Sequence, residues 1–186
     1  ALTSGVSRRA AIQQSLLPAS LPERDDVRFA WAYIPCDELA GDILNVFQLE
    51  DSTIALYLLD VSGHGVPAAL LSVSLSRILS PNLDPMSFVR EITEQGVSRP
   101  ACASEVVARL NRRFQMSDSN EQYFTLLYGL LNTATRELRY VCGGHPSPAH
   151  LPIGEPPRLL TESCGPVGWF EETEFEEYSL ILSPGD

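Results

Sequence analysis

The chain has 186 residues, 44% of them hydrophobic and 20% charged, a composition typical of one soluble globular domain. The formal net charge is −11, and all 13 basic residues are arginines that form no basic stripe, which argues against nucleic-acid binding. No apolar run approaches the roughly 20 residues of a membrane span, so no membrane insertion is expected. The four cysteines are widely spaced, which favours reduced thiols in the cytoplasm over a zinc site or disulfides.

The first part of the chain predicts a helix followed by strands. Residues 7–17 have the pattern of a helix that Pro18 ends, and we expect a terminal helix or the end of a linker from an upstream domain. Residues 27–34 have the aromatic and β-branched content of a buried strand. Two more strands are predicted at 43–49 and 53–59, joined by a polar turn.

Three predicted helices and a second group of strands follow. Pro67 suits a first helical turn, and apolar residues continue at helical spacing to Leu79. Asp84 and Pro85 predict the start of a second helix that Gly96 closes, and a third helix is predicted at 104–114. The later strands are predicted at 123–131, 137–142, 149–151, 158–160 and 173–182. Strands, helices and strands within one domain predict an α+β fold with a largely antiparallel sheet.

The hairpin between residues 42 and 60 predicts a pair of facing carboxylates. If Asp51 is the middle of a three-residue loop, Leu49 faces Thr53, and the same register brings Asp42 opposite Asp60. Such cross-strand neighbours share one face of the sheet, with Cβ atoms about 5 Å apart. Two facing carboxylates repel each other, so the arrangement needs a cation, a proton or solvent.

The surroundings of this pair favour a ligand role. Apolar side chains fill the remainder of both faces of the hairpin, which predicts a sheet covered on both sides. Two acids at the end of such a surface are expected to bind something. Gly63 and Gly65 allow positive φ and close backbone approach directly after Asp60, as an ion or a phosphate requires.

The spacing leaves other interpretations open. Asp42 and Asp60 are of a residue type that commonly caps turns and helices. Ser62 and His64 are types that serve as nucleophile and base, but neither triad spacing nor a Gly-x-Ser-x-Gly string accompanies them. Considered alone, His64 is more often a structural or supporting histidine than a catalytic one.

Several strings across the chain match one family in their order. The most specific are Asp-Val-Ser-Gly-His-Gly at residues 60–65 and Gly-Gly-His-Pro at 143–146. Further matching strings lie at residues 11–18, 40–42, 66–69, 124–128, 147–148, 165–168 and 184–186. The chain thus resembles, over almost its whole length, the bacterial sporulation-stage-II-E branch of the metal-dependent protein phosphatases of type 2C, which includes stress-regulator phosphatases. The resemblance implies an antiparallel β-sandwich flanked by helices in α-β-β-α layers, with residues 1–18 as the end of a linker helix and 19–186 as the phosphatase-like domain.

The resemblance also implies a centre of two divalent cations, Mn2+ or Mg2+. The aspartate matching Asp60 bridges both ions in this family, the backbone carbonyl matching Val61 binds one, and the aspartate matching Asp42 joins directly or through water. Hard divalent cations prefer such oxygens. The reaction implied is dephosphorylation of serine or threonine by water, without a phosphoenzyme. The residues expected on the substrate side or behind the ligands are Gly63, His64, Gly65 and His145.

The branch's usual substrates are phosphorylated anti-anti-sigma proteins of the STAS type. The resemblance therefore implies signal transduction in stress response and sigma-factor regulation. The domain often follows a sensory or receiver domain, as the output domain of a response regulator. The N-terminal helix is then expected to connect the two domains and to form a homodimer contact.

The chain departs from the branch in two places. Ala40 and Asn45 stand where a glycine and a second aspartate are usual. The family continues after the turn at 184–186 with a Thr-Asp-Gly strand that supplies a further metal ligand, so we expect weak metal affinity and little turnover from these 186 residues alone. Two alternatives stay open: a pseudophosphatase that binds a regulator without hydrolysing it, and a structural output domain whose linker helix transmits dimerisation.

Overall fold

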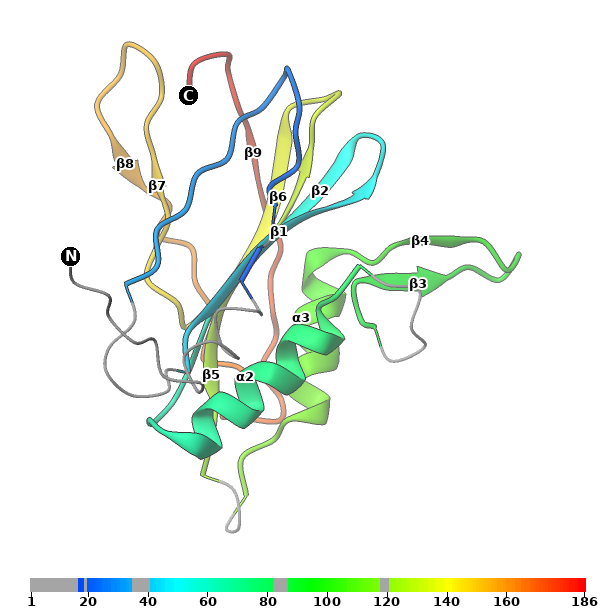
Figure 1. Ribbon diagram of the computed structural model, residues 1–186, viewed down its shortest axis with the longest axis vertical. Helices are drawn as coiled ribbons and strands as arrows, with labels where there is room; N and C mark the ends of the chain where they lie inside the picture. Colours follow the sequence, from blue (N-terminus) through cyan, green and yellow to red (C-terminus); the bar gives the residue numbers. More distant parts are fainter. Residues whose placement is uncertain (1–16, 19, 35–40, 82–86, 118–120) are drawn as a thin grey trace, which may run out of the picture.

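The computed structural model of the chain describes residues 17–18, 20–34, 41–81, 87–117 and 121–186. Three sequence expectations fall outside this part: the body of the helix predicted at 7–17 with its dimer contact, the helix start at Asp84 and Pro85, and the position of Ala40. Figure 1 shows the course of the chain.

One antiparallel sheet forms the centre of the domain, with its five strands in the order β1-β2-β5-β6-β9. These strands are β1 (Ile43–Glu50), β2 (Thr53–Val61), β5 (Phe124–Asn132), β6 (Glu137–Gly143) and β9 (Tyr178–Ile181). Two small hairpins accompany the sheet: β3 (Arg90–Ile92) with β4 (Ser98–Pro100), and β7 (Ala149–His150) with β8 (Arg158–Leu159). The predicted α+β class is confirmed.

The register predicted for the first hairpin is confirmed along most of its length. Ile43 pairs with Leu59, and the same register continues to the pair of Gln48 with Ile54. At the turn, however, Glu50 pairs with Thr53, and the register shifts between Gln48 and Glu50. The loop is therefore one residue shorter than predicted. A β-bulge absorbs the difference, so the register at the far end of the hairpin is unaffected.

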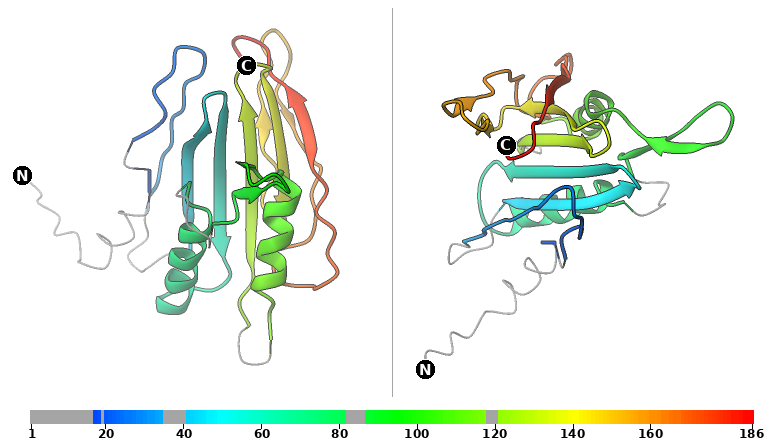
Figure 2. Two further views of the ribbon diagram at one scale, coloured as in Figure 1. Left: turned by 90° about the vertical axis from the view of Figure 1, so that its right-hand side faces the viewer. Right: turned by 90° about the horizontal axis from the view of Figure 1, so that it is seen from above.

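Two helices cover one face of the sheet, as the left view of Figure 2 shows. The first, α2 (Val66–Ile78), packs on β2 and has proline in its first turn, as predicted. The second, α3 (Ala103–Arg113), packs on β5 and β6. Between these layers lies the core, in which side chains of the sheet meet buried side chains of both helices, among them Tyr57, Leu59, Tyr128, Leu75 and Leu110. Figure 1 places the β7–β8 hairpin on the side away from the helices.

The prediction of a strand at residues 27–34 is wrong. Val27 and Phe29 are half-buried while Arg28 and Ala30 are exposed, so the segment keeps a strand-like period of two. No strand among the described residues pairs with it, however, and a β-strand is defined by its ladder partner. The segment is instead fastened at its start, where the Arg24 guanidinium donates a 2.6 Å hydrogen bond to the Asp51 carbonyl in the β1–β2 turn.

The prediction of a helix that ends at Gly96 is also wrong. Residues 90–92 and 98–100 form the β3–β4 hairpin, and Gly96, at φ 78°, belongs to its turn. The turn closes through hydrogen bonds from the Gly96 amide to the Thr93 carbonyl and from the Thr93 amide to the Val97 carbonyl. Ile92 is 78% exposed, so the apolar face expected of a helix is not buried here. As a β-branched residue, Ile92 also favours a strand over a helix. The last predicted strand is likewise shorter than expected, because β9 begins only at Tyr178.

Among the described residues, no helix combines the length and the apolar character needed to cross a membrane.

Candidate metal centre

Asp42 and Asp60 lie together at the end of the β1–β2 hairpin. Asp42 immediately precedes β1, Asp60 is the penultimate residue of β2, and both lie one step beyond the pair of Ile43 with Leu59. Both residues are solvent-exposed. Partial burial first, and then the hydrogen bond and negative charge of Asp42, raise the pKa of Asp60 to about 6. The structure thus brings the two carboxyl groups into contact, as the sequence register predicted, and a cation between them would remove their repulsion.

Gly41 brings the start of β1 against the third predicted ligand, the Val61 carbonyl. A Cβ atom at Gly41 would lie 2.6 Å from the Val61 carbonyl oxygen and 3.0 Å from the Val61 Cβ. No side chain therefore fits at this position without moving the segment that carries Asp42. The side chain of Val61 is buried in the core, which fixes the backbone that carries the carbonyl.

The turn after β2 is fastened to the neighbouring strand. The Ser62 amide donates to the Tyr123 carbonyl (2.9 Å), and the Tyr123 amide donates to Ser62 Oγ (3.0 Å). The Ser62 hydroxyl thus positions the turn, which weighs against a role as nucleophile. Gly63 and Gly65 have φ of 89° and 77°, the positive values that the sequence predicted, and Gly65 directly precedes α2. His64 is exposed in the same turn.

His145 reaches the same end of the sheet through a residue that the sequence did not single out. Thr125 is the cross-strand partner of Asp60, and its Oγ1 forms a 2.9 Å hydrogen bond with His145 Nδ1. Burial lowers the pKa of His145, and the negative charge of Asp42 opposes this effect. Only the pairing of β2 with β5 shows that Thr125 belongs to this site, and sequence spacing alone does not reveal that pairing.

Asp42, Asp60 and the Val61 carbonyl offer hard oxygens, the donors that Mg2+ and Mn2+ prefer. They fit such ions as part of a ligand set. No group of three or more His, Cys, Asp or Glu side chains suited to a metal ion occurs within the described residues. Asn45 pairs with Tyr57. It follows Asp42 by three residues, an odd number, and hence lies on the opposite face of the sheet.

The Asp186 carboxylate forms hydrogen bonds at another place in the fold. Its carboxylate accepts hydrogen bonds from the Ser183 amide (2.9 Å) and the Ile153 amide (3.0 Å), and it pairs with His150 Nε2 at 2.9 Å. These bonds lower the pKa of Asp186 to about 2. Asp186 thus ties the turn after β9 to the β7–β8 hairpin, away from Asp42 and Asp60.

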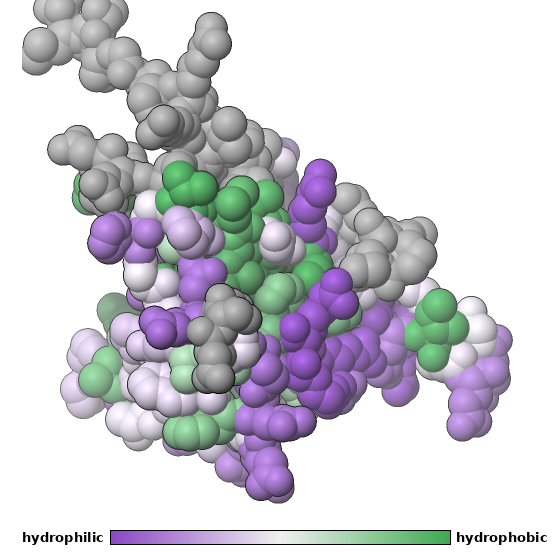
Figure 3. All heavy atoms as spheres, turned by 90° about the horizontal axis from the view of Figure 1, so that it is seen from below, coloured by the Kyte–Doolittle hydropathy of each residue, from purple (hydrophilic) through white to green (hydrophobic). Residues whose placement is uncertain are grey.

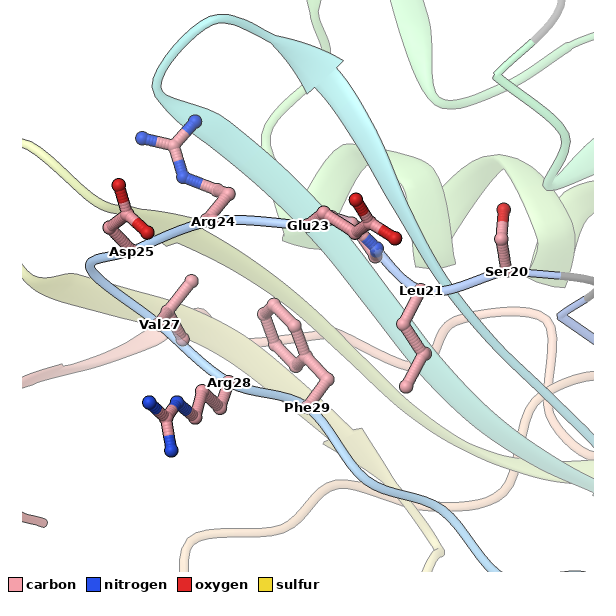
Figure 4. A pocket seen from close by; sticks show the side chains of 9 residues that line it. Ser20, Leu21, Glu23, Arg24, Asp25, Val27, Arg28 and Phe29 are labelled. Carbon is pink, nitrogen blue, oxygen red and sulfur yellow. The ribbon is translucent and has the colours of Figure 1, made fainter.

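Figure 3 views the molecule from the end at which β2 stops and β5 begins, and apolar surface is visible there between hydrophilic residues. A separate hollow lies in the N-terminal segment between Ser20 and Phe29. In Figure 4, Leu21, Val27 and Phe29 point between the two arms of that loop, while Arg24 and Arg28 point away from them. No residue of the candidate metal centre lines this hollow.

Comparison with known proteins connects this geometry to one family. Residues 50–186 match the family described as stage II sporulation protein E (SpoIIE). Phosphoserine phosphatase RsbP of Bacillus subtilis (strain 168) is 31% identical over 156 residues, which cover 84% of this chain and 36% of RsbP. This chain therefore spans little more than a third of that relative.

Solved structures agree with this assignment at the level of the fold. The PP2C phosphatase domain of SpoIIE from Bacillus subtilis superposes with a TM-score of 0.56 at 19% identity, covering 78% of this chain and 39% of that one. The structure of RsbX in complex with magnesium gives a TM-score of 0.57 at 12% identity, covering 78% of this chain and 62% of that one. The fold is that of the PP2C phosphatases. The chain belongs to the stage II sporulation protein E family.

Proposed function

We propose that this domain is a metal-dependent phosphatase that hydrolyses phosphoserine or phosphothreonine in a protein. The contact between Asp42 and Asp60 carries this proposal, because a protein gains nothing from facing two carboxylates unless a cation or a proton joins them. The Val61 carbonyl beside Gly41 adds a third hard oxygen at the same place. The phosphoserine phosphatase RsbP and the PP2C fold support the same reaction class.

The residues of the chain have distinct parts in this chemistry. Asp60 and Asp42 would hold the two ions, Mn2+ or Mg2+, with the Val61 carbonyl. When bound, such ions supply a water-derived nucleophile at neutral pH and neutralise phosphoryl oxygens. Thr125 orients the His145 ring through Nδ1 at the strand position opposite Asp60. The amides of the turn at 63–65 lie at the start of α2, where a helix end favours an anionic phosphate.

The wider role follows from the family and is also proposed here. The domain would be the cytoplasmic output domain of a signalling protein, joined through residues 1–18 to a sensory or receiver domain and dimerising through that helix. Its substrate would be a phosphorylated anti-anti-sigma protein of the STAS type. A Thr-Asp-Gly segment of the full protein would complete the ligand set, since the described residues offer only part of one.

A pseudophosphatase is the second candidate function. The observation that favours it is the partial ligand set: within the described residues, no third carboxylate or imidazole joins Asp42 and Asp60 in a group suited to a metal ion. Such a protein would bind its regulator without hydrolysis. The two candidates differ in turnover and not in partner.

Calorimetric titration with Mn2+ and phosphate release from a phosphoserine protein test the proposal together. The full-length protein should bind Mn2+ and release phosphate, and Asp60→Asn should lose both, while Asp25→Asn, an exposed carboxylate outside the centre, should lose neither. Partner binding without Mn2+ binding or turnover would identify a pseudophosphatase instead.

A further inference from the structure

Three aromatic side chains form a ridge at the end of the sheet that carries the candidate metal centre, with Trp169 and Phe170 exposed and Tyr123 half-buried. The ring centroids of Tyr123 and Trp169 are 4.5 Å apart, and those of Trp169 and Phe170 are 6.0 Å apart in a stacked arrangement. Trp169 is 40% exposed and Phe170 64%. Tyr123, Trp169 and Phe170 are called the aromatic ridge below. Aromatic side chains with this much exposed area are enriched where proteins bind partners.

The aromatic ridge is held in place from below by a buried side chain. Asn111 of α3 is 2% exposed; its amide nitrogen donates to the Phe170 carbonyl (3.0 Å) and the Glu171 carbonyl (3.2 Å). Its amide oxygen accepts the Gly168 N–H at 2.7 Å. At Gly168, φ is 86° and an added Cβ would lie 2.2 Å from the Phe114 carbonyl oxygen. The loop that carries Trp169 and Phe170 is therefore preorganised, which lowers the entropic cost of binding.

Strand pairing sets the distance from the ridge to the candidate metal centre. Val61 pairs with Phe124, and Phe124 in turn bridges to Val167, with hydrogen bonds of 3.1 and 2.8 Å between their backbones. Two steps of about 4.8 Å place Val167 roughly 10 Å from Val61. Trp169 follows Val167 by two residues. At about 3.3 Å per extended residue, the start of the loop that carries Trp169 and Phe170 thus lies about three residues from Val61 of the candidate metal centre.

The ridge also lies at the end of the sheet that carries Asp60. Phe124 points into the core, and Thr125, opposite Asp60, points to the other face. Tyr123 immediately precedes β5 and lies two residues before Thr125, the cross-strand partner of Asp60. Its backbone is bonded to Ser62, two residues after Asp60.

We propose that the aromatic ridge is the docking surface for apolar side chains of the phosphoprotein substrate, about three to four residues from its phosphoserine. The inference rests on the proposed function and names a recognition element for it. A metal centre recognises the phosphate of any phosphoserine, so selection among phosphoproteins needs contacts outside the centre. Glu171, Glu172 and Glu174 follow Phe170 closely in the sequence and are exposed, and these negative charges favour a segment that combines apolar and basic residues.

Two synthetic peptides test the docking surface. Both carry one phosphoserine and an arginine at each end; one has leucines at the third and fourth positions on either side of the phosphoserine, and the other has alanines there. The metal-loaded full-length protein should show a KM at least about tenfold lower for the leucine peptide. Trp169→Ala combined with Phe170→Ala should erase this preference and leave the hydrolysis of p-nitrophenyl phosphate unchanged. Ile92→Ala combined with Val97→Ala, which removes two exposed apolar side chains from the β3–β4 region, should keep the preference.

The docking surface is refuted if the wild-type protein shows no leucine preference, or if the double variant at 169 and 170 retains it. Equal loss of p-nitrophenyl phosphate hydrolysis would also refute it, because the ridge would then support the centre itself. Fluorescence anisotropy with labelled peptides and Asp60→Asn separates this inference from the proposed function. If the wild-type protein hydrolyses neither peptide nor p-nitrophenyl phosphate, the proposed function fails. In that case, tighter binding of the leucine peptide that depends on Trp169 and Phe170 still supports the docking surface. Absence of this binding preference refutes the docking surface.

Discussion

Asp42 and Asp60 are neighbours whose carboxyl groups share a hydrogen bond, although both side chains are accessible to water. Two repelling carboxylates that are free to move in water separate. These two stay in contact because the β1–β2 register places them opposite each other. In the absence of a cation, a proton on the pair relieves the repulsion. Partial burial first, and then the hydrogen bond and negative charge of Asp42, raise the pKa of Asp60 to about 6 from its ordinary 3.8.

The first prediction concerns the pH dependence of stability without metal. Because Asp60 binds its proton more tightly in the folded state, its contribution stabilises the fold at low pH and is lost as pH rises through about 6. In a chelator at pH 7, Asp60→Asn should therefore raise the free energy of unfolding by about 1 kcal/mol, a value reduced by solvent screening. It should also flatten the change in Tm between pH 5 and 7. Thermal unfolding with Asp25→Asn as the control checks this, and a lower Tm for Asp60→Asn at pH 7 would contradict it.

The contact of Asp42 with Asp60 also shows what the sequence can and cannot predict. Alternating apolar residues and a short polar turn define the hairpin register, and the β-bulge near Leu49 changes the turn without moving the pair. His145 was expected near the centre from the family resemblance alone, and Thr125 was not expected. Their relation to Asp60 depends on a pairing between strands separated by two helices, which register reasoning within one hairpin does not reach. Local patterns also predicted a helix ending at Gly96, where tertiary context favours a hairpin, and a strand at 27–34, whose pattern has no partner in the described structure.

The second prediction concerns Gly41. Gly41→Ala would place a Cβ atom 2.6 Å from the Val61 carbonyl oxygen, so the segment before β1 must move away. We expect a loss of about 1–3 kcal/mol in stability and at least a tenfold weaker affinity for Mn2+, because the displacement separates Asp42 from Asp60. Gly165→Ala is the matched control, since the nearest atom to its Cβ is a Thr173 methyl carbon at 3.9 Å. Unchanged Mn2+ affinity in Gly41→Ala, measured by calorimetry, would show that Gly41 does not position this site.

The third prediction concerns the hydrogen bond between Thr125 and His145. Thr125→Val keeps the shape of the side chain and removes the hydroxyl that holds Nδ1. We expect kcat on a phosphoserine peptide to fall by about tenfold, with a change of less than about 1.5 kcal/mol in stability. Thr125→Ser retains the hydroxyl and should recover most of the activity. If the valine and serine variants lose kcat equally, the contribution of Thr125 is packing and not orientation of the imidazole.

The fourth prediction tests whether the aromatic ridge needs a fixed loop conformation in addition to its aromatic side chains. Asn111→Asp keeps the size of the side chain but cannot donate to the Phe170 and Glu171 carbonyls, and it leaves these groups without their buried partner. We expect a loss of about 1–3 kcal/mol in stability, together with loss of the leucine preference although Trp169 and Phe170 are still present. Asn132→Ala, which removes side-chain hydrogen bonds to two backbone amides in the β5–β6 turn, should cost stability and keep the preference. Retention of the preference in Asn111→Asp would mean that the two exposed rings recognise their partner without a fixed loop, because preorganisation is the only contribution that Asn111 makes to the ridge.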